Sequence, residues 1–172
     1  RYPEFALSFY NLIPSCSFCN SILKNEKETV LDKHIHPYMD TDAGFEFTYN
    51  FIGKDTDGKN LYGVDCNITA VGIKDKRRVK ETLELFRIKE VYNAHAGLEL
   101  KDLIDLATAN PGDYIDELVN HVLANTHLTK EDVFRILFGV ETLPNRYLNR
   151  PFSKFKMDII SKIHDIIING KK

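Results

Sequence analysis

Two cysteines near the start of the chain have the type and spacing most suited to chemistry. Cys16 and Cys19 are separated by two residues, and the third cysteine, Cys66, lies far along the sequence. An odd cysteine count with one close pair does not predict a disulfide framework, whereas Cys-x-x-Cys is a usual spacing for two zinc ligands. A redox pair would need a βαβ surrounding that is absent here, and two small buried apolar side chains are the plainer alternative. The pair predicts two thiolates of a structural zinc site.

Two histidines offer one way to complete such a site within this chain. His34 and His36 follow the cysteines in the pattern Cys-x2-Cys-x14-His-x-His. The spacing between the histidines departs from the usual three to five residues, although side chains two apart in a strand face the same side. His36 precedes Pro37 and can either face a catalytic metal or phosphate, or simply pack against Tyr38. Both alternatives stay open.

The residues around the cysteine pair carry a wider pattern. The stretch from Asn11 to Asn20 reads Asn-Leu-Ile-Pro-Ser-Cys-Ser-Phe-Cys-Asn, and Lys24 follows. It resembles the second half of the HNH, or ββα-metal, nuclease motif, in which Asn-Leu-x-Pro-x-Cys-x-x-Cys precedes His or Asn and then Lys. His36-Pro37-Tyr38 and the segment 149–154 are similar to features of a bacterial subgroup. Its members are often encoded beside an ABC-type ATPase in phage-defence or restriction loci.

The resemblance implies a division of roles among these residues. In the family, one divalent ion polarises the scissile phosphate while a His acts as general base. Asn20 matches a ligand of that ion, and its amide oxygen suits Mg²⁺ or Mn²⁺. Asn11 matches the middle Asn, which braces the loop that bears the His. The implied catalytic residues are Asn11, Asn20 and His36, and the implied metal ligands are Cys16, Cys19 and Asn20.

Half of the family motif is missing from this sequence. The Asp-His pair and a second Cys-x-x-Cys lie upstream in relatives, and the chain opens at Arg1 without an initiator Met. Arg1 to Glu4 resembles the tail of the stretch that follows Asp-His. We therefore expect further residues upstream, and we expect this segment alone to be inactive.

Composition limits the possible classes of protein. The chain has 172 residues, of which 43% are hydrophobic and 28% charged, which is an ordinary globular balance. Its net charge of −2 argues against a broad DNA-coating surface but permits a local basic cleft. The longest apolar clusters are too short to span a bilayer, so a cytoplasmic protein without a membrane segment is expected.

Alternation of apolar and polar residues predicts a β-hairpin after the motif. Residues 44–52 alternate with an aromatic face, and residues 61–72 alternate with an aliphatic one. Between them, Asp55 to Gly58 supplies turn residues, and the spacing of a calcium loop is not met. The sequence therefore predicts two antiparallel strands joined by a longish turn.

Helical periodicity begins near Asp75 and continues to the end. The expected helices cover 76–95, the stretch from Gly97 to Asn110, 114–123, a segment from Thr129 to Gly139, and 152–168. Thr129 followed by Asp132 resembles a capping box. The predicted fold class is α+β: a partial ββα-metal zinc motif, a β-hairpin, and a bundle of four or five helices. Residues 1–40 are expected to form the motif, and residues 41–172 one domain.

Three surface features have both a functional and a plain interpretation. The cluster Lys74, Lys76, Arg77, Arg78 and Lys80 can contact phosphate or form the solvated face of a helix start. The same alternatives apply to Arg150, Lys154 and Lys156. The aromatic residues of 45–51 can stack on bases, although an aromatic strand face is more often part of the core.

These observations lead to two main hypotheses. The first is a metal-dependent DNA endonuclease of the HNH class, in phage defence or restriction, with structural Zn²⁺ and catalytic Mg²⁺ or Mn²⁺. The second is a non-catalytic, zinc-stabilised adaptor that docks a partner such as an ABC-type ATPase. A helical regulatory domain with a vestigial zinc loop is a third.

Overall fold

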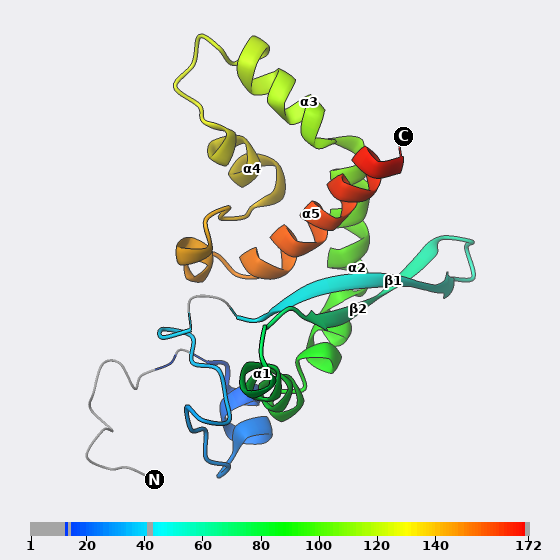
Figure 1. The fold of residues 1–172 in the computed structure, drawn as a ribbon. Helices are drawn as coiled ribbons and strands as arrows, with labels where there is room; N and C mark the ends of the chain where they lie inside the picture. Colours follow the sequence, from blue (N-terminus) through cyan, green and yellow to red (C-terminus); the bar gives the residue numbers. More distant parts are fainter. Residues whose placement is uncertain (1–12, 14, 41–42, 171–172) are drawn as a thin grey trace. The chain divides into compact units, whose positions relative to one another are not determined.

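The computed structural model describes residue 13 and residues 15–40 and 43–170, apart from the side chains of 95–98 and 166–170 (Figure 1). A single β-hairpin is followed by a series of helices in this part of the chain, which confirms the α+β class. The elements in order are η3 (Phe18–Lys24), β1 (Phe45–Lys54), β2 (Asn60–Ile68), α1 (Ile73–Leu85), α2 (Ile88–Ala109), α3 (Gly112–Glu117), η4 (Leu118–Val122), α4 (Lys130–Phe138), η5 (Pro144–Asn149) and α5 (Ser153–Gly170).

The chain divides into two compact units. The first consists of the chain up to Glu46 together with Asn67–Val91, and therefore holds the cysteine motif and α1. The second consists of Phe47–Cys66 and Tyr92–Lys172, and therefore holds most of the hairpin and the later helices. The expected boundary between residues 40 and 41 stays a prediction.

The hairpin turn is closed by one aspartate. Asp55 Oδ1 accepts hydrogen bonds from the backbone N–H of Asp57 at 2.9 Å and of Lys59 at 2.8 Å. Gly58 adopts φ +77° and donates its N–H to the Asp55 carbonyl. This is an Asx-type turn with glycine at the left-handed position, and it confirms the predicted turn.

The aromatic face of β1 is core at one end only. Phe47 is 4% exposed and contacts the rings of Tyr92 and Phe155, with centroids 4.4 and 5.3 Å away. Tyr49 is half-buried and Phe51 is 58% exposed. The expectation that this face packs into the core therefore holds near the start of β1 and fails toward the turn.

Side chains from helices close both edges of the hairpin near its base. Asn93 of α2 accepts from the Val64 N–H and donates to the Val64 carbonyl, each at 2.8 Å. On the other strand, the Phe47 N–H donates to Asp158 of α5 at 2.9 Å. A two-stranded sheet exposes unpaired backbone groups on both edges, and these side chains satisfy three of them, at Val64 and Phe47.

One predicted helix is two helices in the structure. The stripe over 76–95 is divided between α1 and α2 at Phe86 and Arg87, where Arg87 has φ +45°. The break expected at Gly97 does not occur, because α2 continues through it. A glycine inside a helix costs only about 1 kcal/mol, which a long helix tolerates. Arginine has no preference for a left-handed turn, so the sequence around Arg87 gives no signal of the break.

The ends of α4 match the sequence prediction. Thr129 Oγ1 accepts from the Asp132 N–H at 3.2 Å, and Asp132 Oδ2 accepts from the Thr129 N–H at 3.0 Å. Gly139 follows the helix with φ +63°. Together these form a capping box and a left-handed C-cap, each of which satisfies backbone groups that a helix end leaves unpaired. The helix expected over 114–123 is present as α3 and the π-type turn η4.

The second unit has a continuous apolar core. Its fully buried side chains come from β2, α2, α3, α5 and the segment after α4, and include Val64, Leu100, Ile115, Val140, Ile159 and Ile160. Among the helices of the described part, none is both long and apolar enough to cross a membrane.

A half-buried histidine lies at the margin of this core. His164 of α5 has its ring 6.4 Å from that of Phe134, and a methyl group placed on Gly112 would lie 3.4 Å from its Nδ1. Its Nε2 is buried and has no hydrogen-bond partner among the described residues. Burial lowers the pKa of His164 below the usual 6.5, and nearby Lys130 acts in the same direction. The ring is therefore neutral at neutral pH.

We expect His164 to make the fold sensitive to acid. Because its pKa is lower in the folded state, the unfolded chain binds more protons as the pH falls below 6.5, and stability is lost in that window. When the pH is lowered from about 7.5 to about 5, the fall in the thermal unfolding temperature should be smaller for His164→Gln than for the unchanged protein. His127→Gln, at an exposed position, should show the same fall in unfolding temperature as the unchanged protein. If the unfolding temperature depends on pH in the same way in all three proteins, His164 is not the source of the acid sensitivity.

Candidate functional site

The cysteine pair forms a tight turn at the start of η3. The Cys19 N–H donates to Cys16 Sγ at 3.4 Å, and the Asn20 N–H donates to the Cys16 carbonyl at 3.0 Å. The hydrogen bond from Cys19 lowers the pKa of the Cys16 thiol, whereas burial and the neighbouring Cys16 sulfur raise the pKa of Cys19. Cys16 is therefore the first of the two to form a thiolate, the species that binds metal.

Asn20 lies in the same turn with an exposed side chain. It belongs to η3, a π-type turn. This turn ends at Asn25, which has φ +46° and donates its N–H to the Asn20 carbonyl at 3.0 Å. The exposed amide of Asn20 is open to a ligand from solvent. Asn11 lies outside the described residues, so its predicted role stays a prediction.

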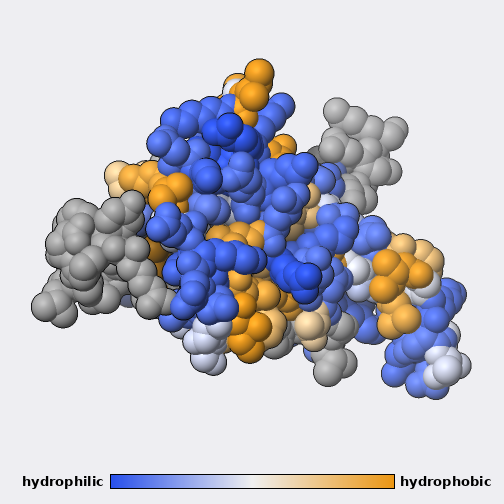
Figure 2. All heavy atoms as spheres, turned by 90° about the horizontal axis from the view of Figure 1, so that it is seen from below, coloured by the Kyte–Doolittle hydropathy of each residue, from blue (hydrophilic) through white to orange (hydrophobic). Residues whose placement is uncertain are grey.

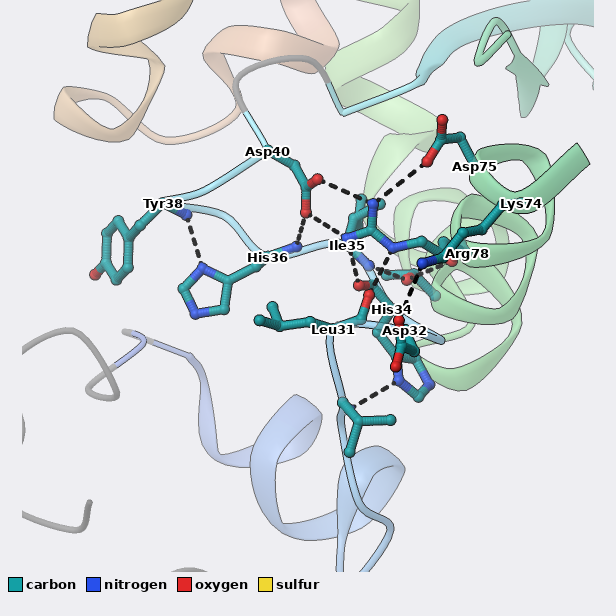
Figure 3. A network of polar contacts seen from close by, with 12 residues as sticks. Leu31, Asp32, His34, Ile35, His36, Tyr38, Asp40, Lys74, Asp75 and Arg78 are labelled. Atoms are coloured by element: carbon teal, nitrogen blue, oxygen red, sulfur yellow. Dashed lines mark hydrogen bonds and ion pairs between the residues drawn. The ribbon is translucent and has the colours of Figure 1, made fainter. Parts of the chain in front are cut away.

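Both histidines of the motif form local contacts through Nδ1. His34 Nδ1 accepts from the Val30 N–H at 3.3 Å, and His36 Nδ1 accepts from the Tyr38 N–H at 3.2 Å. The His36 ring also lies 5.8 Å from the Tyr38 ring (Figure 3). A neutral imidazole that accepts at Nδ1 carries its proton on Nε2. In this state His36 can donate a hydrogen bond to a phosphate, but it cannot bind a metal through Nε2.

The predicted ligands are only partly brought together. In residues 13, 15–40 and 43–170, no three His, Cys, Asp or Glu side chains form a group that could hold a metal ion. Cys16 and Cys19 therefore do not gather His34 and His36 into a self-contained site there. The described chain supplies two adjacent sulfurs, which is half of the donor set of a tetrahedral zinc site.

One arginine fixes the irregular segment that carries the histidines. Arg78 of α1 donates from Nε to the Leu31 carbonyl at 2.7 Å and from Nη2 to the His34 carbonyl at 3.0 Å (Figure 3). Its Nη1 and Nη2 also bind the two carboxylate oxygens of Asp40, at 3.1 and 2.9 Å. The guanidinium thus joins α1 to three points of the segment 31–40.

Asp40 extends this network to His36. Its Oδ2 accepts from the His36 N–H at 2.6 Å (Figure 3). Partial burial favours a higher pKa for Asp40, but the hydrogen bonds from Arg78 and from the His36 N–H outweigh it and lower that pKa. A further bond runs from the Ile35 N–H to Thr82 Oγ1 at 3.0 Å. The position of His36 is therefore set by α1.

The predicted basic clusters are largely paired with acidic groups. Arg78 is a structural residue, with 14% of its side chain exposed. The other pairs of the first cluster have more exposed cations: Lys74–Asp32, Arg77–Glu81 and Lys80–Glu84. The second cluster forms the pairs Arg150–Glu141, Lys154–Asp158 and Lys156–Glu99. Several partners are distant in sequence, so charge counting along the chain could not reveal them.

Comparison with known proteins finds a similarity to a phage protein. Part of the chain is 34% identical over 108 residues to protein ea31 of Escherichia phage lambda. The match covers 60% of this chain and 36% of that protein, so the chain spans about a third of the length of this relative. No protein-family model matches the chain, and no solved structure matches it.

The Arg78 network predicts a contrast between two neighbouring arginines. Arg78→Lys keeps the charge but cannot form the planar two-pronged bond to Asp40 while also reaching Leu31 and His34. We expect it to destabilise the protein by about 1.5–3 kcal/mol in urea unfolding, the range for hydrogen bonds to charged groups. It should also speed hydrogen exchange at the amides of Ile35 and His36.

Arg77→Lys is the matched control. Arg77 is 60% exposed and pairs with Glu81 at 3.7 Å, so its replacement should change stability by less than about 0.5 kcal/mol. Equal effects of the two substitutions would show that Arg78 does not hold the segment.

Proposed function

We propose that this chain is part of a metal-dependent DNA endonuclease of the HNH class. The observation that carries the proposal is the Asn-Leu-Ile-Pro-Ser-Cys-Ser-Phe-Cys-Asn stretch, whose two cysteines lie in one turn with a hydrogen bond onto Cys16 Sγ. The reaction is the hydrolysis of a phosphodiester bond. The Asp-His pair that this reaction requires would come from chain outside the present sequence.

The residues present fit the structural zinc of that family. An N–H donor on Cys16 favours the thiolate, and Cys19 stands three positions on in the same turn. Cys16 and Cys19 would hold the ion, with two further ligands from elsewhere in the protein. When bound, zinc would stabilise the turn η3, which has no buried residue.

Asn20 fits the catalytic divalent ion. Its side chain is exposed, and an amide oxygen is a hard donor of the kind that Mg²⁺ and Mn²⁺ prefer. When bound, such an ion supplies charge stabilisation at the scissile phosphate. Asn20 would orient toward it from a turn fixed at both ends by hydrogen bonds to Cys16 and Asn25.

His36 would serve this chemistry as a hydrogen-bond donor. Because Nδ1 accepts from the Tyr38 N–H, the proton of the neutral ring is on Nε2 and can be donated to a phosphate oxygen. Arg78 and Asp40 hold the backbone of this residue in place. Its proposed role is therefore to position the phosphate.

We expect Asn20→Ala to impair cleavage without unfolding the protein. In the full-length protein, Mg²⁺-dependent nicking of a plasmid should fall by at least about 100-fold, because a ligand of the reacting ion is removed. Asn120→Ala, which removes another exposed amide, is the matched control and should cleave normally. Undiminished cleavage by Asn20→Ala would refute its assignment.

The zinc content of the purified variants shows whether a substitution removes a ligand of the catalytic ion or disrupts the zinc-bound motif. Asn20→Ala should retain the zinc of the unchanged protein, and Cys16→Ser should lose it. Cys66→Ser provides the matched cysteine control and should keep it, since Cys66 lies on β2. If Cys16→Ser and Cys66→Ser bind zinc equally well, the cysteine pair is not a ligand pair.

A second candidate is a zinc-stabilised adaptor that docks a partner such as an ATPase. The observation in its favour is the apolar end of the hairpin, where Phe51, Ile52 and Leu61 are 58%, 61% and 42% exposed. Absence of nicking by the full-length, zinc-loaded protein would favour this function over the endonuclease.

A further inference from the structure

The two most exposed large apolar side chains of the described chain are neighbours. Val71 is 88% exposed and Ile73 is 91% exposed, on either side of Gly72. Single exposed apolar residues are ordinary, whereas two β-branched ones with nearly full exposure, two positions apart in a short loop, are not. The face in Figure 2 is mostly hydrophilic, with apolar residues gathered in separate patches. We therefore expect a binding partner to cover Val71 and Ile73.

The loop that presents this pair is firmly anchored. The N–H groups of Thr69 and Ala70 both donate to the Gly44 carbonyl, at 2.9 and 3.0 Å. On the other side of the loop, the Lys76 N–H donates to the Gly72 carbonyl at 3.1 Å. Gly72 has φ +93°, a conformation that side chains rarely adopt. The two apolar side chains are thus held outward by a fixed backbone.

The base of this loop is closely packed around Gly44. A Cβ atom at this position would lie 2.8 Å from Val79 Cγ2 and 3.0 Å from Ala70 Cβ. Both distances are too short for carbon atoms, so the loop base, Gly44 and α1 leave no space for a side chain. Because the loop is already fixed, less conformational entropy is lost when a partner binds to it.

Positive charge follows the apolar pair along α1. Residues 71–87 contain six basic and three acidic side chains, and Asp32 and Asp40 pair with two of the cations, which leaves a local excess of one positive charge in a chain whose net charge is −2. Lys74, Lys76 and Arg77 come directly after Ile73, and the ion pairs of Lys74 and Arg77 are exposed. Exposed pairs are weak and can exchange their carboxylates for phosphates.

We propose that this surface, which we call the wedge surface, binds duplex DNA. Its residues are Val71, Ile73, Lys74, Lys76 and Arg77. The cations bind backbone phosphates, and the two aliphatic side chains enter the minor groove and part a base step, as apolar wedges do in DNA-bending proteins. The proposal rests on the proposed function in taking DNA as the substrate.

An anionic membrane has a related chemistry but suits the surface less well. A helix that lies in a membrane needs a continuous apolar face toward the lipid. In α1, Val79 is 2% exposed and packs within the first unit, and the exposed side is charged. The apolar part of the wedge surface consists of only two aliphatic side chains on a short loop, which is the size of an apolar wedge at a base step and too small for a lipid-facing helix.

Binding and bending of a short duplex test the wedge surface without cleavage. The zinc-loaded full-length protein, without Mg²⁺, is titrated into a duplex labelled at both ends, and anisotropy and energy transfer are followed. Val71→Ser/Ile73→Ser should weaken binding by about 10-fold or more and abolish the bend, since the wedge is removed. The matched control Val122→Ser/Ile136→Ser removes two aliphatic side chains that are each 69% exposed and should bind and bend DNA normally.

The cations are tested separately by the salt dependence of binding. Lys74→Gln/Lys76→Gln/Arg77→Gln should lower the slope of log K against log salt by about 1 for each phosphate that the protein no longer neutralises. Thermal unfolding of every variant confirms that the fold is retained. Unchanged affinity, bend and salt slope in the wedge variants would overturn the proposal. If the wedge variants lose binding to phosphatidylserine vesicles but bind DNA as the unchanged protein does, the proposal would be overturned in favour of a membrane.

The two proposals fail in different ways. If the unchanged protein bends DNA through Val71 and Ile73 but Mg²⁺ produces no nicking, the endonuclease proposal fails and the wedge surface stands. If nicking occurs and the wedge variants bind and bend DNA normally, the wedge surface fails and the endonuclease stands.

Discussion

In the first unit, the segment 31–40 depends on a single guanidinium in place of regular secondary structure. The segment 31–40 forms only turns, so its carbonyl groups need donors from elsewhere. Arg78 donates to the carbonyls of Leu31 and His34 and binds both oxygens of Asp40. Lysine has one nitrogen and could not span these acceptors. The fixed position of His36 follows from this one side chain, because Asp40 in turn accepts from its N–H.

The same network gives the basic residues of α1 two different roles. Arg78 is mostly buried and satisfied by the protein, whereas Lys74 and Arg77 are 65% and 60% exposed. A buried pair costs desolvation that only good geometry offsets, but an exposed pair can exchange partners at little cost. The sequence does not distinguish these cations, and burial separates those that build the fold from those that are open to an anionic ligand.

Local signals explain what the sequence predicted well. The α4 capping box, the Asp55 turn and the alternating strands each depend on residues within a few positions, and all three were predictable. The break at Arg87 was not, because Arg87 adopts a left-handed conformation for which arginine has no preference. In the candidate site, the turn of Cys16 and Cys19 follows from their spacing. The contacts of Arg78 cross more than 30 residues of sequence, and no local pattern encodes them.

The first turns of α1 connect the two features of the first unit that we associate with DNA. Lys76 closes the loop of Val71 and Ile73 through Gly72, and Arg78, two residues on, holds the segment of His36. The loop of Val71 and Ile73 and the segment of His36 are thus attached to α1 through different residues. Disturbing Arg78 would therefore shift His36 while leaving the wedge in place. Binding and bending would survive, and only the placement of the phosphate would suffer.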